Sequence, residues 1–285
     1  MQEFNIGSLT IMSGGVPAPG FTLSIPIEGL DGPKHRTSSY SKPGRHGVEV
    51  SAQFYDERLV TFTGLIYGES LEEFEANRRA LITAVAIKKD DDGYPEPTRV
   101  SFTTLAGDSY IVDIYFDKPL MNMESPIHAT YQVTGVCADP FIFGASTVTS
   151  AQIRPPSGGG YAVPMIVPYI SDASVGGSIT LTNDGTETAM PVITLTGLLT
   201  QPVLSNQTTG KRLELNYVLP EGEPLTIDME NQLIIRSGAS QIGAKTIASD
   251  WWGLAPGPNA ISLTTMSSSD TGYALLTFNP PYMGV

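Results

Sequence analysis

The sequence predicts a mostly β protein built from two β-sandwich domains, the first of which carries one α-helix. Apolar and polar residues alternate with a period of two over most of the chain, as they do in half-buried antiparallel strands. A single segment follows a helical period instead. The 285 residues exceed what one ordinary core accommodates and include 29 Gly and 22 Pro, so we expect two domains of short strands and turns.

The first domain is expected over residues 1–144. Its alternating runs are rich in β-branched and aromatic residues and are bounded by Gly, Pro or Asp, which is typical of strands. These runs cover residues 21–27, 48–54, 60–66, 99–103, 110–116 and 128–134. The only cysteine, Cys137, is predicted to be a small buried core residue, and a lone cysteine leaves no internal disulfide or cysteine-based metal cluster to form.

The helical segment runs from Ser70 to Lys88. Ser70 and Glu73 have the spacing of a capping box, and further acidic residues crowd the expected amino-terminal end, where the helix dipole favours negative charge. Four apolar residues are expected to share one face of the helix and to cover one side of a sheet. They are Leu71, Phe74, Leu81 and Val85.

Residues 145–160 are rich in Ser, Thr, Gly and Pro and are interpreted as a linker. The second domain, residues 161–285, contains only strand patterns, with a turn signal every eight to twelve residues or so, which predicts a β-sandwich of jelly-roll or lectin type. The expected strands lie at residues 162–170, 177–182, 191–196, 212–218, 225–227, 232–235, 260–265 and 273–278.

The formal net charge of −13 argues against a nucleic-acid-binding protein, because such proteins neutralise phosphates with a basic face. It also argues against docking on an anionic membrane surface. The first residues lack the basic and apolar regions of a secretory signal, and no window holds the roughly 20 apolar residues of a membrane span. We therefore expect neither specific nucleic-acid binding nor membrane insertion.

Candidate catalytic and metal-binding residues are sparse. None of His35, His46 and His128 has a second histidine or a cysteine at the spacing of a metal site, and no nucleophile elbow, P-loop or dinucleotide fingerprint occurs. We therefore expect no catalytic residue, no metal and no cofactor. A cell-wall hydrolase stays open as an alternative, because a glycosidase needs only two carboxylates that face a cleft.

One segment, residues 33–47, concentrates positive charge in an acidic chain. It is either a solvated hairpin loop or an arm that pairs with an acidic surface of another subunit. A loop of this length inside a compact domain is uncommon unless it has a function, which favours the arm. The candidate subunit or partner contacts are Lys34, His35, Arg36, Lys42, Arg45 and His46.

The two tryptophans, Trp251 and Trp252, precede a Pro-Gly turn. An exposed tryptophan of a β-sandwich can stack on a sugar ring, whereas a tryptophan before such a turn more often packs at the base of the sandwich. We expect at least one of the pair to pack in this way. Sugar stacking by the other keeps a carbohydrate-binding module, which would recognise a host cell-wall sugar, as the alternative function.

Seven short motifs follow one another along the chain in a recognisable order. In the first domain they are Gly44-Arg-His-Gly47, Arg58-Leu-Val-Thr-Phe-Thr-Gly-Leu-Ile-Tyr-Gly68 and Cys137-Ala-Asp-Pro-Phe-Ile-Phe-Gly144. In the second they are Leu181-Thr-Asn-Asp-Gly185, Pro191-Val-Ile-Thr-Leu-Thr-Gly197, Leu225-Thr-Ile-Asp228 and Trp252-Gly-Leu-Ala-Pro-Gly-Pro-Asn259. In their order and spacing, these motifs resemble the siphophage distal tail protein family over nearly the whole chain.

The resemblance implies a structural protein rather than an enzyme. Members of this family form a ring, commonly a hexamer, at the end of the tail tube. Their first domain builds the ring, and their second, a galectin-like sandwich, points outward. The implied partners are further copies of the chain, the tail tube protein, the tail hub protein, and a receptor-binding protein or side fibres. DNA crosses such a ring without specific binding, and the implied location is the virion tail tip, assembled in the bacterial host cytoplasm.

Overall fold

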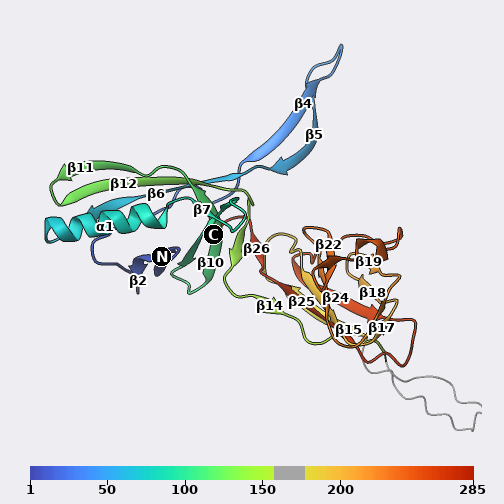
Figure 1. The fold of residues 1–285 in the computed structure, drawn as a ribbon. Helices are drawn as coiled ribbons and strands as arrows, with labels where there is room; N and C mark the ends of the chain where they lie inside the picture. The colour runs from blue at the N-terminus through green and yellow to red at the C-terminus, as the bar shows by residue number, and fades with distance from the viewer. Residues whose placement is uncertain (157–176) are drawn as a thin grey trace, which may run out of the picture. The chain divides into compact units, whose positions relative to one another are not determined.

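The structure, a computed structural model, describes residues 1–156 and 177–285 (Figure 1). The chain divides into two compact units. Unit 1 comprises Met1–Ser146 together with Pro281–Val285, and unit 2 comprises Thr147–Pro280. Residues 281–285 therefore return to unit 1 after the chain has formed unit 2. Antiparallel strands dominate both units, which confirms the predicted mostly β fold class.

Unit 1 contains two antiparallel layers that share β10 (Ser109–Phe116). The bounds of the other strands in these layers are β1 (Glu3–Ile6), β2 (Leu9–Ser13), β3 (Val16–Pro17), β6 (Arg58–Tyr67), β9 (Thr98–Thr103), β11 (Leu120–Ser125), β12 (His128–Cys137), β13 (Ile142–Gly144) and β26 (Pro281–Tyr282). β10 pairs with β9 up to Ile114 and then with β12 at Tyr115 and Phe116, so it passes from one layer into the other. β6 and β11 flank β12 in the second layer.

The core of unit 1 lies on the inward faces of these strands, because successive side chains of a strand point to opposite sides. Along β12, every second residue is buried, and β6 shows the same pattern. Phe4 of β1 meets Phe62 of β6 edge to face, with ring centroids 5.0 Å apart. Cys137 is fully buried, as predicted, and burial raises the pKa of its thiol to about 12.

The predicted helix is α1 (Leu71–Ala84), and it contacts β6 and β2. The hydroxyl of Ser70 accepts a hydrogen bond of 3.2 Å from the backbone N–H of Glu73, as expected of a cap. Phe74 is buried as predicted, but Leu71 is 59% exposed. Each helical residue turns by about 100°, so Leu71 stands about 60° away from Phe74 around the axis, and it lies in the first turn.

Two further expectations for unit 1 need correction. The helix ends at Ala84 rather than at Lys88, and Lys88 begins a small hairpin of β7 (Lys88–Lys89) and β8 (Pro95–Glu96). Residues 21–27 do not form a continuous strand: Phe21 forms an isolated bridge with Ile66 of β6, and Thr22 and Ser24 donate backbone hydrogen bonds to β6. Pro26 has no N–H to donate to a strand ladder, which accounts for the interruption.

Unit 2 contains a six-stranded sheet, in the order β14-β25-β16-β21-β22-β23, and a four-stranded sheet, in the order β15-β24-β18-β19. Its elements are β14 (Val148–Thr149), β15 (Ser178–Asn183), β16 (Val192–Thr196), β17 (Leu199–Thr200), β18 (Val203–Asn206), β19 (Lys211–Glu214), β20 (Val218–Leu219), β21 (Leu225–Asp228), β22 (Leu233–Arg236), β23 (Ala239–Ser240), the 3₁₀ turn η1 (Ile242–Ala244), β24 (Gly257–Thr264) and β25 (Tyr273–Phe278). Apolar side chains from both sheets form one buried cluster.

The expected linker over residues 145–160 differs from the structure. β14 pairs with β25, and Ile153 forms a further bridge with Ala274, so this stretch supplies an edge of the unit 2 sheet. Its serines and threonines suit an edge strand as well as a linker, which is why composition alone did not separate the two. Residues 157–160 of that linker and the strand expected at residues 162–170 lie outside the described residues.

Three buried asparagines hold the loop of residues 250–257 in unit 2. The side chain of Asn259 donates to the carbonyl oxygen of Ala255 at 2.7 Å and accepts from the N–H of the same residue at 3.0 Å. Asn183 and Asn206 each donate to another carbonyl oxygen of this loop, at 2.9 and 3.0 Å. The loop also pairs with the rest of unit 2 through the isolated bridge of Leu254 with Ala189, and the buried amides satisfy further backbone groups of the loop.

Candidate functional site

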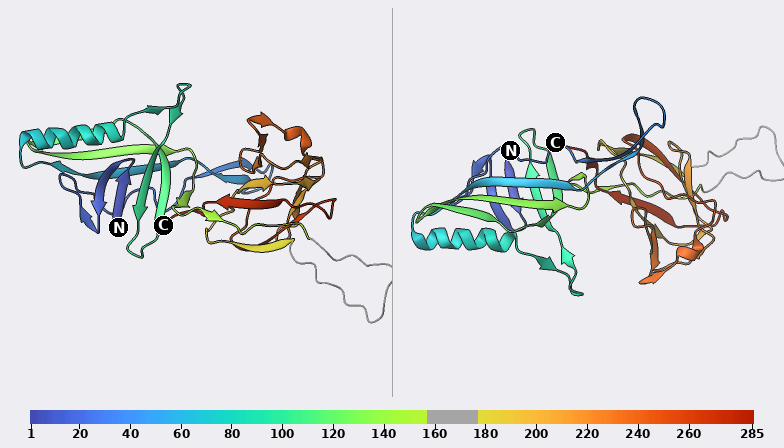
Figure 2. Two further views of the ribbon diagram at one scale, coloured as in Figure 1. Left: turned by 60° about the horizontal axis from the view of Figure 1, so that its bottom comes forward. Right: turned by 90° about the horizontal axis from the view of Figure 1, so that it is seen from above.

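The structure brings the six predicted contact residues together on one hairpin, here called the arm (residues 34–55). The arm consists of β4 (His35–Ser41) and β5 (Val48–Tyr55), which pair only with each other (Figures 1 and 2). Lys34, His35 and Arg36 lie at its base, and Lys42, Arg45 and His46 lie at or beside its turn. Pro43 and Gly44 supply the turn, where Gly44 has a φ of +67°.

Every residue from Lys34 to Phe54 is exposed, which corrects the expectation of a half-buried strand at residues 48–54. The alternation that predicted the strand is present, but neither face of the arm packs on unit 1. Val48 and Val50 point to one face and are 55% and 52% exposed, while Tyr40 lies opposite Glu49 on the other face and is 56% exposed. Both faces of the arm therefore expose apolar side chains that a partner surface could cover.

The arm also differs in charge from the rest of the chain. It carries four of the 16 Lys and Arg residues but only one of the 29 Asp and Glu residues, which is Glu49. The remaining chain therefore holds 12 basic residues against 28 acidic ones. A basic, partly apolar hairpin is complementary to an acidic surface, and the rest of the chain carries a formal net charge of −16.

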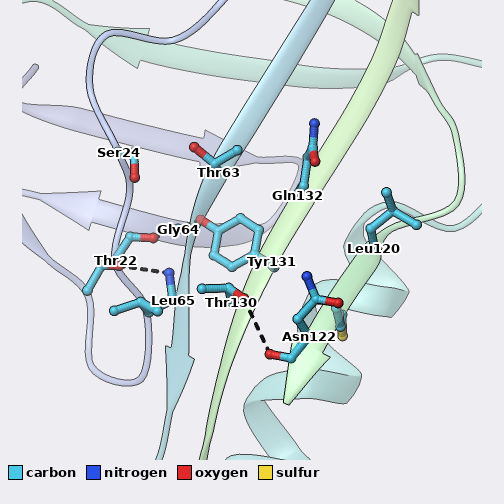
Figure 3. A pocket seen from close by; sticks show the side chains of 11 residues that line it. Thr22, Ser24, Thr63, Gly64, Leu65, Leu120, Asn122, Thr130, Tyr131 and Gln132 are labelled. Atoms are coloured by element: carbon cyan, nitrogen blue, oxygen red, sulfur yellow. Dashed lines mark hydrogen bonds between the residues drawn. The ribbon is translucent and has the colours of Figure 1, made fainter. Parts of the chain in front are cut away.

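A groove of about 500 Å³ crosses the outer face of β6 and β12 (Figure 3). Thr22 and Ser24 stand on one side of it and Leu120 and Asn122 on the other. Thr22 pairs with the backbone of β6, and its carbonyl oxygen accepts a hydrogen bond of 2.8 Å from the hydroxyl of Tyr131. These contacts hold residues 22–24 beside β6 as one wall of the groove.

The groove offers hydrogen-bonding groups but no charged side chain. None of its eleven lining residues is charged, and most of them carry hydroxyl or amide groups. Burial raises the pKa of Tyr131 well above its ordinary value, so this phenol stays protonated. Such a lining can bind a polar chain or a hydrogen-bonding surface, and it contains no histidine, lysine or carboxylate that could activate its hydroxyl groups.

The two tryptophans of unit 2 have different environments. Trp252 is 1% exposed and belongs to the core, and its indole N–H has no hydrogen-bond partner among the residues that the structure describes. Trp251 is half-buried, and the ammonium of Lys245 lies over its ring, 5.6 Å from the centroid. Trp252 therefore has no face to offer a sugar ring, and Trp251 has one face already in contact with a cation.

Residues 1–156 and 177–285 contain no group of three or more His, Cys, Asp or Glu side chains placed to hold a metal ion. Among the same residues, α1 and η1 are too short and too polar to cross a membrane.

Comparison with known proteins finds a family model that matches part of the chain, mostly in unit 2. Residues 184–282 match the family model described as the siphovirus-type tail component, C-terminal domain. Over these residues the chain is similar to a siphovirus-type tail component domain. The match covers three of the motifs quoted from the sequence in full, so the resemblance to siphophage distal tail proteins is confirmed.

The fold of the chain resembles those of two solved phage proteins. One is the Dit protein of phage SPP1, described as a paradigm of the hub adsorption apparatus in phages that infect Gram-positive bacteria. The TM-score is 0.65, with 13% identity over 92% of this chain and 93% of that one. The other belongs to the phage P2 baseplate in its activated conformation with Ca, with a TM-score of 0.50 and 10% identity over 100% of both chains. A search of curated proteins found no match.

Proposed function

We propose that the chain is a structural subunit of a siphophage tail tip or baseplate, in which copies join into a ring through their arms. The observation that carries the proposal is the arm, a basic hairpin exposed over its whole length on a chain that is also similar to a tail component domain over residues 184–282. A two-stranded hairpin is only marginally stable alone in water, so a partner surface is expected to cover its apolar side chains.

The same chain carries both complementary charges, the basic arm and an acidic remainder. An arm-to-body contact is heterologous, and repeating it from copy to copy closes a ring when the rotation between copies allows it. The resemblance implies six copies, with the tail tube protein on one face and the tail hub protein on the other. A receptor-binding protein or side fibres would then attach to unit 2. This role includes no chemical step, in keeping with the uncharged groove.

The carbohydrate-binding alternative receives less support. It depended on a tryptophan that presents a free ring face, and Trp252 is buried in the core. Trp251 remains, but Lys245 lies over its ring. We therefore propose that unit 2 contributes to protein contacts in the tail tip.

Replacement of residues 36–54 by an Asn-Gly turn tests the role of the arm. The base of the arm is kept, because the N–H of Asp56 donates to the carbonyl oxygen of Lys34 at 2.7 Å. Native mass spectrometry and sedimentation velocity would be recorded for the full chain, alone and with the tail tube and hub proteins of the same virus. We expect rings from the wild type and monomers from the variant, with unchanged melting temperatures.

A pair of matched triple variants separates specific from general charge effects. R36Q/K42Q/R45Q removes three charges from the arm, and R79Q/K88Q/K89Q removes three exposed charges from the body of unit 1. Only the first is expected to weaken assembly, and more strongly at low salt than at high salt. A wild-type chain that stays monomeric and ignores both partner proteins would contradict the proposal.

A further inference from the structure

We propose that Arg58 and residues Pro281–Val285, here called the return segment, form an anchor that positions the root of the arm. The inference rests on the proposed role of the arm. Gly29 lies shortly before the first residue of the arm, Lys34, and Arg58 shortly after its last, Tyr55. The root of the arm is the backbone at these two positions. All parts of the anchor lie within unit 1.

Arg58 joins three separate stretches of backbone at the root. Its side chain is almost fully buried, with the residue 1% exposed. Its Nε donates to the carbonyl oxygen of Pro140 at 2.8 Å and its Nη1 to that of Gly29 at 2.6 Å. Its Nη2 donates to the carbonyl oxygen of Met283 in the return segment. The planar guanidinium thus fixes these three carbonyls in one geometry.

The guanidinium charge of Arg58 is buried, so its hydrogen-bond acceptors are required for stability. Burial lowers the pKa of Arg58, and the nearby Asp139 opposes that shift. A guanidinium nevertheless stays protonated in proteins, so its charge must be met by acceptors. Because an unpaired buried charge is strongly unfavourable, the loss of one carbonyl would disturb the positions of the other two.

The return segment also contacts the residues that lead into the arm. The N–H of Val285 donates to the carbonyl oxygen of Leu30 at 3.2 Å. Gly284 packs so closely that an added Cβ would lie 1.9 Å from the carbonyl oxygen of Asp31. Pairing of β26 with β13 through Tyr282 and Ile142 holds the segment in register. The entry to the arm is therefore held against a fixed strand.

The end of the second arm strand, at Tyr55, also packs beside the acceptors of Arg58. The ring of Tyr55 lies 5.3 Å from that of His35 across the hairpin and meets Phe141 edge to face at 5.7 Å. Phe141 directly follows Pro140, whose carbonyl oxygen Arg58 binds. Both strands of the arm thus reach the anchor within a few residues of where they begin or end.

The length of the arm explains why its root must be held. The seven residues of β4 span about 23 Å at 3.3 Å per residue, so a tilt of about 10° at the root moves the tip by about 4 Å. Such a displacement would remove the tip from contact with a neighbouring copy.

Because the return segment is synthesised after unit 2, only chains that contain the whole of unit 2 can complete the anchor.

Distance measurements between two spin labels test the anchor independently of assembly. Labels at S41C on the arm and T10C on β2 would be measured by pulsed electron resonance on dilute monomer. Both sites are exposed, whereas the native Cys137 is buried and stays unlabelled. We expect one narrow distance distribution for the wild-type background. Gly284→Ala should shift or broaden it by about 4 Å or more.

Gly32→Ala is the matched control, because an added Cβ there meets nothing within 4 Å. It should leave the distribution and ring formation unchanged, while Gly284→Ala should weaken assembly about tenfold or more. Arg58→Lys, which presents one ammonium in place of a fork, should broaden the distribution as well. If Arg58→Lys does not fold, Gly284→Ala decides alone. A folded Gly284→Ala protein with the wild-type distribution would overturn the anchor.

The two proposals can fail separately. Intact rings from the chain that lacks residues 36–54 would refute the role of the arm in assembly. The label distances would still show whether Arg58 and the return segment hold the arm.

Discussion

The arm of unit 1 lies outside the large sheets, and so does most of the loop of residues 250–257 in unit 2. The two segments differ in how their side chains are accommodated. Buried asparagines, among them Asn259, hydrogen-bond to the backbone of the loop, and Trp252 fills the core beside it. Nothing in unit 1 covers the arm between its base and its turn, and apolar residues such as Val50 remain exposed on it.

This difference separates structural motifs from assembly surfaces. Trp252 and Asn259 belong to one of the family motifs. Trp252 packs in the core of unit 2, and Asn259 hydrogen-bonds to the backbone of unit 2. The arm combines exposed apolar side chains with a net positive charge, whereas the rest of the chain is net negative, so the role of the arm is expected to lie outside the subunit. Three substitutions, in order of decreasing effect on folding, test this distinction.

The largest effect on stability is expected from Trp252→Ala. Loss of this fully buried side chain leaves a cavity in unit 2 and should lower the free energy of unfolding by about 3–5 kcal/mol. Trp251→Ala is the matched control, and we expect it to cost clearly less because Trp251 is only half-buried. Urea unfolding followed by circular dichroism measures both. Equal losses for the two variants would mean that the pair packs as one unit.

Much of the fold could be predicted from the sequence because its signals are local. The capping pattern at Ser70 gave the start of α1, and the period-two runs gave most strands of both units. The exposure of β5 (Val48–Tyr55) could not be predicted, because alternation indicates a pleated strand but not whether the same subunit covers it. The predicted burial of Leu71 is wrong, because its position around the helix axis lies at the edge of the buried face.

A smaller loss is expected from Asn259→Ala. The substitution leaves the N–H and carbonyl of Ala255 without their side-chain partner. Because Ala255 is only half-buried, we expect the lower end of the usual cost, about 1 kcal/mol for each group and about 2 kcal/mol in all. Asn259→Asp keeps an acceptor but loses the donor, and it should destabilise unit 2 as well. Calorimetry should show a lower transition for unit 2 and an unchanged one for unit 1; a shift of both would argue against a local role.

The candidate site was only partly visible in the sequence. The basic concentration at Lys34–His46 identified the arm, because charge is a property of composition. The contacts of Arg58 with Gly29 and Met283 join residues far apart in the chain, and no local pattern announces them. One signal was present: the alternation of β6 places Arg58 on the same inward face as Val60, which marks a buried cation that needs acceptors.

The smallest effect on folding and the clearest effect on assembly are expected from the double variant V48S/V50S. Both side chains are more than half exposed, and exposed substitutions usually change stability by about 0.5 kcal/mol or less. If a neighbouring copy buries both valines, their replacement by serine should weaken ring formation about tenfold or more.

Val218→Ser provides the control for this variant, since Val218 is 56% exposed on unit 2 and lies outside the arm. Sedimentation velocity over a concentration series would compare the three proteins. A loss of thermal stability in the V48S/V50S monomer would show that the valines already pack within the subunit. Unchanged assembly in both variants would place the contact between copies on other residues. Weaker assembly in V48S/V50S alone, at constant stability, would show that a second copy buries these valines. The arm would then differ from the loop of residues 250–257, whose contacts lie within unit 2.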